Sequence, residues 1–261
     1  MLIKRKSIEQ IESSRPARKP RYAPVTLSEQ NGVRYLHFGT EWVQGAMRLR
    51  KPDWLELEYA QQMMAWMLFI EQPRQIVQLG LGTAALTKFC YRHFPDAQVR
   101  AIELNPSVIT ICASMFKLPP DDARLCVSEM DALDFVNDSA NHATLDALQV
   151  DLYDATARGP VLDSADFYSA CAACLAPHGI VTVNLFGDHP SYAKNIKAMK
   201  FAFDQVICLP EVHDGNVVAI CFKTKPVLDF DALAARAAQI LGATKLPAPS
   251  WIKGIRSSLQ N

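Results

Sequence analysis

Asp151 and Asp154 are the residues whose type and spacing point most directly to chemistry. They lie three positions apart in the segment VDLYDA, directly after the apolar run Ala147–Val150. Two carboxylates in one loop can face one pocket, where they can hold an ammonium group and take its proton as the amine attacks an electrophilic carbon. The spacing supports a second interpretation equally well, in which one Asp caps the next segment and the other is a surface residue.

A second group of candidate residues forms a glycine turn followed by an acid. The segment QLGLGTAA spans Gln78–Ala85 and lies between an apolar run and a helical segment. Gly80 permits a tight turn, Gly82 lets a ligand approach the backbone, and Ala85 permits close packing of helix on strand. Glu103 follows about 20 residues later, where an acid can accept hydrogen bonds from a ribose diol. This order predicts a nucleoside-binding unit rather than a glycine-containing turn of an unrelated α/β domain.

Asp131 indicates which nucleoside this unit binds. It follows the next expected strand, Arg124–Val127, and an acid there can accept a hydrogen bond from an adenine amino group. A nicotinamide dinucleotide needs a helix N-terminus for its pyrophosphate and has little use for this acid. S-adenosylmethionine and its relatives carry no phosphate and need more side-chain contacts, together with room for a cationic sulfonium. The sequence therefore favours a sulfonium nucleoside over NAD.

The elements that must position these residues alternate between strands and helices. Further strands are expected at Ile180–Leu185, Gln205–Leu209 and Val217–Phe222, and no helix separates the last two. This pattern predicts an α/β fold with a Rossmann-like, mostly parallel sheet of the S-adenosylmethionine-dependent transferase type, ending in an antiparallel edge pair. Ligands bind beyond the carboxyl ends of such strands, so the glycine turn, Glu103, Asp131 and the two Asp residues are expected on one rim.

The remaining segments suggest how the chain is divided. Short alternating runs before residue 50, with Asn31-Gly32 between two of them, predict a small antiparallel β element. The expected division is a flexible basic arm (1–24), a small N-terminal β domain (25–54), a Rossmann-like catalytic domain (55–241) and a C-terminal tail (242–261).

Composition excludes several classes of protein. The chain has 27 basic and 27 acidic residues, so no net field favours nucleic acid. No apolar run approaches the ~20 residues that span a bilayer, and the N-terminal stretch lacks the apolar core of a secretory signal. Seven cysteines, an odd number, predict reduced thiols and a cytoplasmic protein. The six histidines show no ligand spacing, so no metal site is expected.

Between about Val33 and Thr224 the chain resembles the polyamine aminopropyltransferase (spermidine synthase) family, especially its divergent bacterial members. The motifs that carry the resemblance are WVQGAM, LELEYAQQMM, QLGLGTAAL, AIELN, MDALDF, VDLYD, GPVLDSADFY and LAPHGIVTVNLFG. The resemblance implies transfer of an aminopropyl group from decarboxylated S-adenosylmethionine to a small-molecule amine, a diamine such as putrescine, with release of methylthioadenosine. It also implies a homo-oligomer, expected to be a dimer, formed through the N-terminal strands.

The resemblance assigns roles to residues that match the family motifs. Those implied to bind the co-substrate are Gln44, Gly80, Gly82, Thr83, Glu103 and Asp131. Asp151 resembles the catalytic Asp, Asp154 the second Asp that holds the amine, and Tyr59 the tyrosine of the substrate pocket.

Some positions depart from the family pattern. Thr83 stands where the family usually has an Asp that holds the aminopropyl amine, and Leu209-Pro210 stands where it usually has Tyr-Pro. Thr83 favours one alternative function, an S-adenosylmethionine-dependent methyltransferase, because intact S-adenosylmethionine keeps its carboxylate. Another alternative is a nucleoside-binding paralogue without catalysis.

Overall fold

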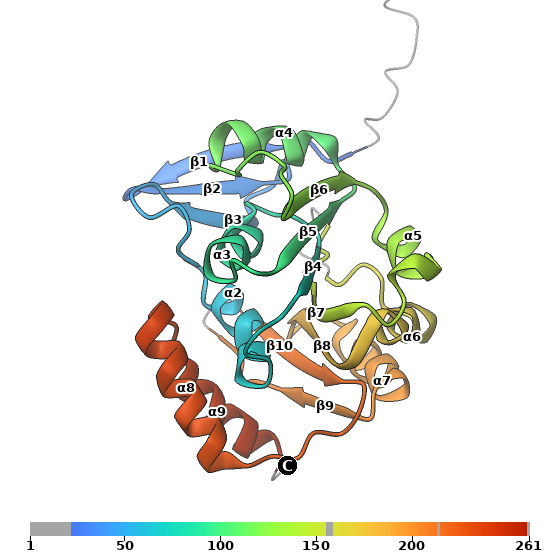
Figure 1. Cartoon of the computed structure of the whole chain (residues 1–261). Coiled ribbons are helices and arrows are strands. Elements are labelled where there is room, and N and C mark those ends of the chain that lie inside the picture. The colour runs from blue at the N-terminus through green and yellow to red at the C-terminus, as the bar shows by residue number, and fades with distance from the viewer. Residues whose placement is uncertain (1–21, 155–158, 213–214, 260–261) are drawn as a thin grey trace, which may run out of the picture.

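The computed structural model of the chain describes residues 22–154, 159–212 and 215–259 (Figure 1). The basic arm expected at residues 1–24 therefore lies outside the described residues up to residue 21. The described strands are β1 (Thr26–Gln30), β2 (Val33–His37), β3 (Val43–Arg48), β4 (Gln75–Leu79), β5 (Gln98–Glu103), β6 (Leu125–Glu129), β7 (Leu145–Val150), β8 (Leu175–Phe186), β9 (Gln205–Cys208) and β10 (Asn216–Phe222). The described helices are α2 (Glu58–Gln62), α3 (Ala85–His93), α4 (Pro106–Met115), α5 (Ala132–Asn137), α6 (Ala165–Cys174), α7 (Tyr192–Ala202), α8 (Phe230–Thr244) and α9 (Ala248–Ser258), with 3-10 segments η1 (Met63–Leu68) and η2 (Ser139–Asn141).

Seven strands form the central sheet in the order β6-β5-β4-β7-β8-β10-β9. The strands from β4 to β8 pair in parallel, as the alternation of strands and helices predicts. Strand β10 runs antiparallel to both of its neighbours, so β9 again points in the direction of the parallel strands. The predicted Rossmann-like sheet with an antiparallel edge pair is confirmed, and within that pair β10 is the reversed strand.

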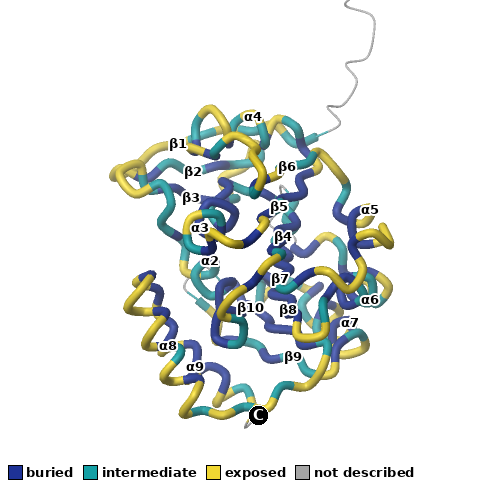
Figure 2. Tube along the Cα trace, viewed as in Figure 1, coloured by how far each residue is buried: buried dark blue, intermediate teal, exposed yellow. Residues whose placement is uncertain are grey.

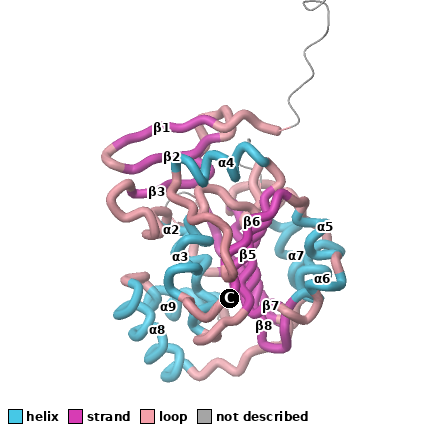
Figure 3. Tube along the Cα trace, turned by 45° about the horizontal axis from the view of Figure 1, so that its top comes forward, coloured by secondary structure: helices cyan, strands magenta, loops and turns pink. Residues whose placement is uncertain are grey.

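Helices cover both faces of this sheet (Figures 1 and 3). Helices α5, α6 and α7 lie on one face, and α3, η1, α8 and α9 lie on the other. On β4, Ile76 packs into one core and Val77 into the other, because successive side chains of a strand point to opposite faces. Figure 2 shows the strands of this sheet as largely buried, which is usual for parallel strands covered on both faces. Among the described residues, no helix is long and apolar enough to cross a membrane.

The centre of the sheet contains a topological switch point. Strands β5 and β7 lie on opposite sides of β4. The N–H of Gly80 donates to Ile102 O at 2.8 Å, and the N–H of Asp151 donates to Leu79 O at 2.9 Å. The residues that follow β4 and β7 are therefore held side by side, at the point where such sheets bind ligands.

The N-terminal strands form a separate antiparallel sheet in the order β1-β2-β3, as the Asn31-Gly32 signal predicts. Strand β3 of this sheet packs against the turn before α3. The hydroxyl of Thr83 donates to Ala46 O at 3.3 Å, and a Cβ on Gly45 would lie 2.7 Å from Thr83 Cγ2. The absence of a side chain at residue 45 therefore lets the N-terminal sheet approach the central domain closely.

Two segments differ from what the sequence pattern predicts. The first is Leu55–Ile70, where apolar residues at helical spacing before Pro73 predict one long helix. Helix α2 ends at Gln62, and the chain continues as the 3-10 segment η1. Every residue of η1 is buried, so its side chains pack all round the axis rather than along one stripe. The hydroxyl of Thr182 in β8 also donates to Met63 O at 3.0 Å, which pairs this carbonyl with the sheet.

The second difference is at the C-terminus, where the expected tail from residue 242 is wrong for most of its length. Helix α8 continues to Thr244, and α9 follows at Ala248–Ser258. Trp251, Ile252 and Ile255 of α9 are buried, and their spacing places them on one helix face. Gly242 does not end α8, whose C-cap is Lys245 in a left-handed conformation.

Candidate functional site

A cleft of about 880 Å³ lies at the carboxyl ends of the parallel strands, between them and the N-terminal sheet. This volume is within the range of small-molecule sites. The site residues proposed from the sequence that line the cleft are Gln44, Tyr59, Gly80, Gly82, Glu103, Asp131, Asp151 and Asp154. The structure thus brings to one cleft eight of the nine residues that sequence reasoning selected.

The glycine turn after β4 lies between two halves of the cleft. We name them by their predicted ligands: the nucleoside side holds Glu103 and Asp131, and the amine side holds Asp151 and Asp154. Gly80 has φ of +86°, and a Cβ on it would lie 2.1 Å from the carbonyl oxygen of Asp151. Glycine adopts this conformation without strain and leaves room for the neighbouring strand end. The backbone of β4 can therefore lie directly against that of Asp151.

Glu103 ends β5 on the nucleoside side of the cleft. Its Oε2 accepts a hydrogen bond from the N–H of Leu81 at 2.9 Å, and its Oε1 accepts one from the N–H of Asn105 at 2.8 Å. Burial raises the pKa of Glu103, and these backbone hydrogen bonds oppose the rise. A carboxylate oxygen can accept more than one hydrogen bond, so the fixed carboxylate keeps capacity for a ribose diol.

Asp131 lies at the lip of the cleft and has a structural role that the sequence analysis did not anticipate. It is the N-cap of α5, and its Oδ1 accepts a hydrogen bond from the N–H of Leu133 at 2.8 Å. Its Oδ2 makes no hydrogen bond with the described residues. Asp131 can therefore cap its helix and still offer one oxygen to a ligand.

Asp151 follows β7 at the centre of the cleft and is held by two side chains from other elements. Asn184 Nδ2 of β8 donates to its Oδ1 at 2.9 Å, and Tyr59 Oη of α2 donates to its Oδ2 at 3.4 Å. Burial raises the pKa of Asp151 to about 6, although both hydrogen bonds act to lower it. A carboxylate with this pKa is ionised at neutral pH and can still accept a proton, which suits a general base.

Behind Asp151, the contacts continue through residues that sequence reasoning missed. Asn216 Nδ2 donates to Asn184 Oδ1 at 2.9 Å and to Tyr153 Oη at 3.3 Å. The first contact orients the Asn184 amide so that its N–H₂ group points to Asp151. Asn184 belongs to the motif LAPHGIVTVNLFG, but Asn216 carries no motif, and only the pairing of β8 with β10 places it here.

The N-terminal sheet closes the cleft through two contacts with the opposite wall. Gln44 Nε2 donates to the backbone carbonyl of Asp154 at 3.3 Å. The rings of Trp42 and Phe186 meet edge to face, with centroids 6.3 Å apart. Gln44 therefore lines the cleft and reaches the loop that carries both Asp residues.

Thr83 is the proposed site residue that does not line the cleft. Its side chain is buried against β3 and borders a smaller cavity of about 20 Å³, room for roughly one water molecule. Glu56, Tyr59 and Asp151 also line this cavity, so it lies directly behind the amine side of the cleft.

Leu209-Pro210, where the family usually has Tyr-Pro, also lies outside the cleft. Leu209 is buried, and a Cβ on Gly254 of α9 would lie 2.5 Å from Pro210 Cδ. Helix α9 therefore covers this pair, and neither residue is positioned to touch a ligand of the cleft.

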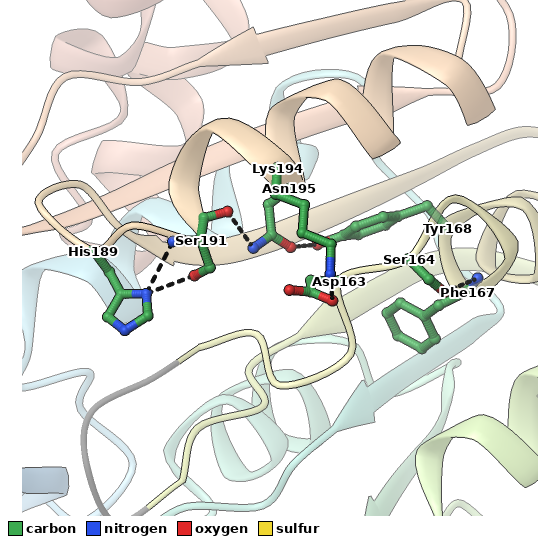
Figure 4. A network of polar contacts seen from close by, with 8 residues as sticks. All are labelled: Asp163, Ser164, Phe167, Tyr168, His189, Ser191, Lys194 and Asn195. Atoms are coloured by element: carbon green, nitrogen blue, oxygen red, sulfur yellow. Dashed lines mark hydrogen bonds and ion pairs between the residues drawn. The ribbon is translucent and has the colours of Figure 1, made fainter.

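Val161 and Leu162 line the far edge of the cleft, and the residues that follow them are joined to α7 by the polar contacts that Figure 4 shows. Lys194 Nζ pairs with Asp163 Oδ1 at 2.8 Å. Asn195 accepts a hydrogen bond from Tyr168 Oη and donates one to Ser191 O at 3.0 Å. This network joins the start of α6 to the start of α7 and so positions this edge of the cleft.

The described lining of the cleft is acidic. The described residues there include five carboxylates and no Lys, Arg or His, and the carboxylates are those of Glu41, Glu103, Asp131, Asp151 and Asp154. Such a cleft attracts cations and repels anions. A sulfonium nucleoside and an alkylamine, both cationic, match this charge.

Comparison with known proteins gives first the fold and then the family. The solved structure of human methyltransferase-like protein 13 in complex with SAH superposes with a TM-score of 0.62 at 21% identity, covering 77% of this chain and 93% of that one. A probable spermidine synthase from Corynebacterium glutamicum superposes with a TM-score of 0.70 at 18% identity, covering 89% and 90%. At these identities the likeness shows the fold alone, which this chain shares with both proteins.

Sequence comparison is more specific. Residues 57–232 match the family model described as the spermine/spermidine synthase domain. A polyamine aminopropyltransferase from Chromobacterium violaceum is 31% identical over 238 residues, covering 90% of each chain. The chain therefore belongs to the spermine/spermidine synthase family.

Proposed function

We propose that this chain transfers an aminopropyl group from decarboxylated S-adenosylmethionine to a diamine such as putrescine and releases methylthioadenosine. The observation that carries the proposal is Asp151, a carboxylate with a pKa of about 6, held between Tyr59 and Asn184 in a cleft lined by acids. Family membership supports the same reaction.

The chemistry requires an amine nitrogen with a free lone pair, aligned with the carbon that leaves sulfur. The nitrogen forms a bond to this carbon, and the carbon–sulfur bond breaks with its electron pair going to sulfur, which becomes a neutral thioether. The nitrogen then carries the positive charge and loses one proton. Asp151 can orient the ammonium form of the acceptor and take a proton from it, and Asp154 lies three residues further along the same loop.

The charge of the site also supports a decarboxylated donor. The described lining of the cleft contains five acids and no basic side chain, and Glu56, which borders the cavity behind it, is paired with Arg48. No cationic side chain of this lining could pair with the carboxylate of intact S-adenosylmethionine, whereas its acids could pair with the ammonium group of a decarboxylated donor. Thr83 carries no charge, so we assign the preference for a decarboxylated donor to the acids that line the cleft.

The test is a turnover assay with purified protein, decarboxylated S-adenosylmethionine and a panel of amines. We expect release of methylthioadenosine from the wild-type chain and a large loss in Asp151→Asn. If no amine yields methylthioadenosine, or if Asp151→Asn behaves as the wild type does, the proposed reaction or the proposed base is wrong.

Thr83 favours a second candidate, a methyltransferase that uses intact S-adenosylmethionine, because it removes the acid that normally holds the aminopropyl amine. Calorimetric titration with the two donors separates the candidates. Tighter binding of the decarboxylated donor supports aminopropyl transfer, whereas tighter binding of S-adenosylmethionine, with S-adenosylhomocysteine as product, supports methyl transfer.

We also infer a homodimer formed through the three-stranded sheet, and a cytoplasmic location. The cysteines, all of which lie among the described residues, form no disulfide, which agrees with a reducing compartment. Sedimentation of the purified chain and of a variant altered on β1 tests the dimer.

A further inference from the structure

Outward from Asp151, one wall of the cleft changes from polar to aromatic. Asn184 and Phe186 are two residues apart on β8, so their side chains point to the same face of the strand. Asn184 donates to Asp151, and Phe186 is the last residue of the strand and also lines the cleft. A molecule whose nitrogen meets Asp151 therefore meets Phe186 as it extends toward the opening.

Trp42, which directly precedes β3, packs against Phe186 from the other side of the cleft. Its ring meets that of Phe186 at an interplanar angle of 72°. Trp42 is 47% exposed although it is a large apolar side chain, and its neighbour Val43 is 45% exposed. Five of the eleven large apolar side chains that are exposed in the described part of the chain line the cleft. Trp42 and Val43 are the two on this wall, whereas Leu104 and Met130 adjoin Glu103 and Asp131. Exposed apolar surface gathered at one site usually marks a place where a ligand is bound.

We propose that Trp42, together with Phe186, binds the alkyl body of the acceptor, and that the site prefers amines with a longer carbon chain than putrescine. This inference rests on the proposed aminopropyl transfer. The acceptor nitrogen is fixed near Asp151, so its methylene groups extend along the aromatic wall. Burial of each methylene group there improves binding by up to about fourfold until the wall is filled.

The experiment compares α,ω-diamines of three to eight carbons. For the wild-type chain we expect KM to fall with each added carbon beyond four, by roughly two- to fourfold per methylene, while kcat changes little. In Trp42→Ala this dependence on length should flatten, and Trp42→Phe should restore most of it. Because Trp42 is half exposed, its replacement should leave the free energy of unfolding nearly unchanged.

Phe201→Ala is the matched control. Phe201 is an aromatic residue on α7, 77% exposed, and it does not line the cleft. The wild-type dependence of KM on chain length should persist in this variant. A putrescine KM as low as those of the longer diamines in the wild type, or an unchanged dependence in Trp42→Ala, would overturn the inference.

A second measurement separates this inference from the proposed reaction. Calorimetric titration of the same diamines into protein saturated with methylthioadenosine reports acceptor binding without turnover. Tighter binding of longer diamines in the wild type, lost in Trp42→Ala, supports the inference even if no product forms in the assay. Equal affinities across the series would overturn it even if aminopropyl transfer is observed.

Discussion

The two halves of the cleft hold their carboxylates in different ways. On the nucleoside side, Glu103 and Asp131 accept hydrogen bonds from backbone N–H groups, and most of these donors lie within two residues in the sequence. On the amine side, the donors to the carboxylate of Asp151 are the side chains of Tyr59 and Asn184, which lie 92 and 33 residues away.

This difference has consequences for both specificity and reactivity. A carboxylate held by backbone N–H groups stays in place when a neighbouring side chain changes, because every residue type except proline supplies the same donor. A carboxylate held by side chains depends on each of those residues. Burial combined with only two side-chain donors also leaves the pKa of Asp151 near 6, where proton transfer at neutral pH is efficient.

Asp151→Asn should have the largest effect and should affect the amine side alone. The amide keeps the size of the carboxylate and can accept from Asn184, but it cannot take a proton. We expect kcat to fall by roughly 10²- to 10⁴-fold, while the donor KM changes by less than about threefold. Steady-state assays of methylthioadenosine release measure both quantities.

The stability of the same variant is the control. The pKa of Asp151 is raised in the folded state, so ionisation of this group destabilises the fold as pH rises from about 4 to 6. Asp151→Asn removes this cost and should melt at the same temperature as the wild type, or higher, at pH 7.5. A lower melting temperature would mean that the loss of activity reflects unfolding. The variant would then give no evidence that Asp151 acts on the amine side alone.

Gly80→Ala should damage both halves, because Gly80 lies where they meet. The added Cβ would lie 2.1 Å from Asp151 O, and φ is +86°. We expect a loss of roughly 2–4 kcal/mol in the free energy of unfolding, measured with denaturant. Gly242→Ala in α8 is the matched control, because nothing lies within 4 Å of its Cβ position, and it should add about 0.5–1 kcal/mol.

The same contrast explains which residues could be predicted from the sequence. The glycine turn, Glu103 and Asp131 belong to local patterns in which each strand is followed by a turn or an acid. The alternation of strands and helices then places these strand ends on one rim, and the structure confirms that order. The fold and the nucleoside side could therefore be predicted, because the sequence patterns that specify them are local.

The parts that sequence reasoning missed depend on packing between distant segments. Asn216 reaches the site because β10 pairs with β8, and Trp42 because β3 closes over the strand ends. Thr83 belongs to the glycine motif, yet its side chain turns toward Ala46 because β3 packs against that side. Helix α9 lies in the segment predicted as a C-terminal tail, and it is held there by burial of Trp251, Ile252 and Ile255 against the rest of the chain.

Asn184→Ala should show that the amine side depends on its side-chain donors. The hydrogen bond from Asn184 lowers the pKa of Asp151, so its loss should raise that pKa further. In the wild type, the acid limb of kcat/KM should have its midpoint near pH 6, with activity lost as Asp151 is protonated below it. The variant should lose roughly 10- to 100-fold in kcat/KM at pH 7, and its acid limb should move to higher pH.

Asn216→Ala gives a graded version of the same test. Asn216 touches Asn184 rather than Asp151, so its removal should shift the acid limb in the same direction by a smaller amount. An acid limb that stays at its wild-type position in both variants would show that the side-chain network does not control the pKa of Asp151.

Asp131→Asn should have the smallest effect and tests the nucleoside side. Asn is as good an N-cap as Asp, so the variant keeps the hydrogen bond to Leu133 and should unfold at the wild-type denaturant concentration. The sequence predicts that an adenine amine donates a hydrogen bond to Asp131, so removal of the negative charge from this acceptor should raise the donor KM by roughly three- to tenfold, with kcat unchanged. Asp131→Ala should add a loss of about 0.5–2 kcal/mol in stability, because it removes the cap as well. If Asp131→Asn leaves the donor KM at the wild-type value, Asp131 serves α5 alone, and recognition of the nucleoside must then rest on Glu103 and the glycine turn.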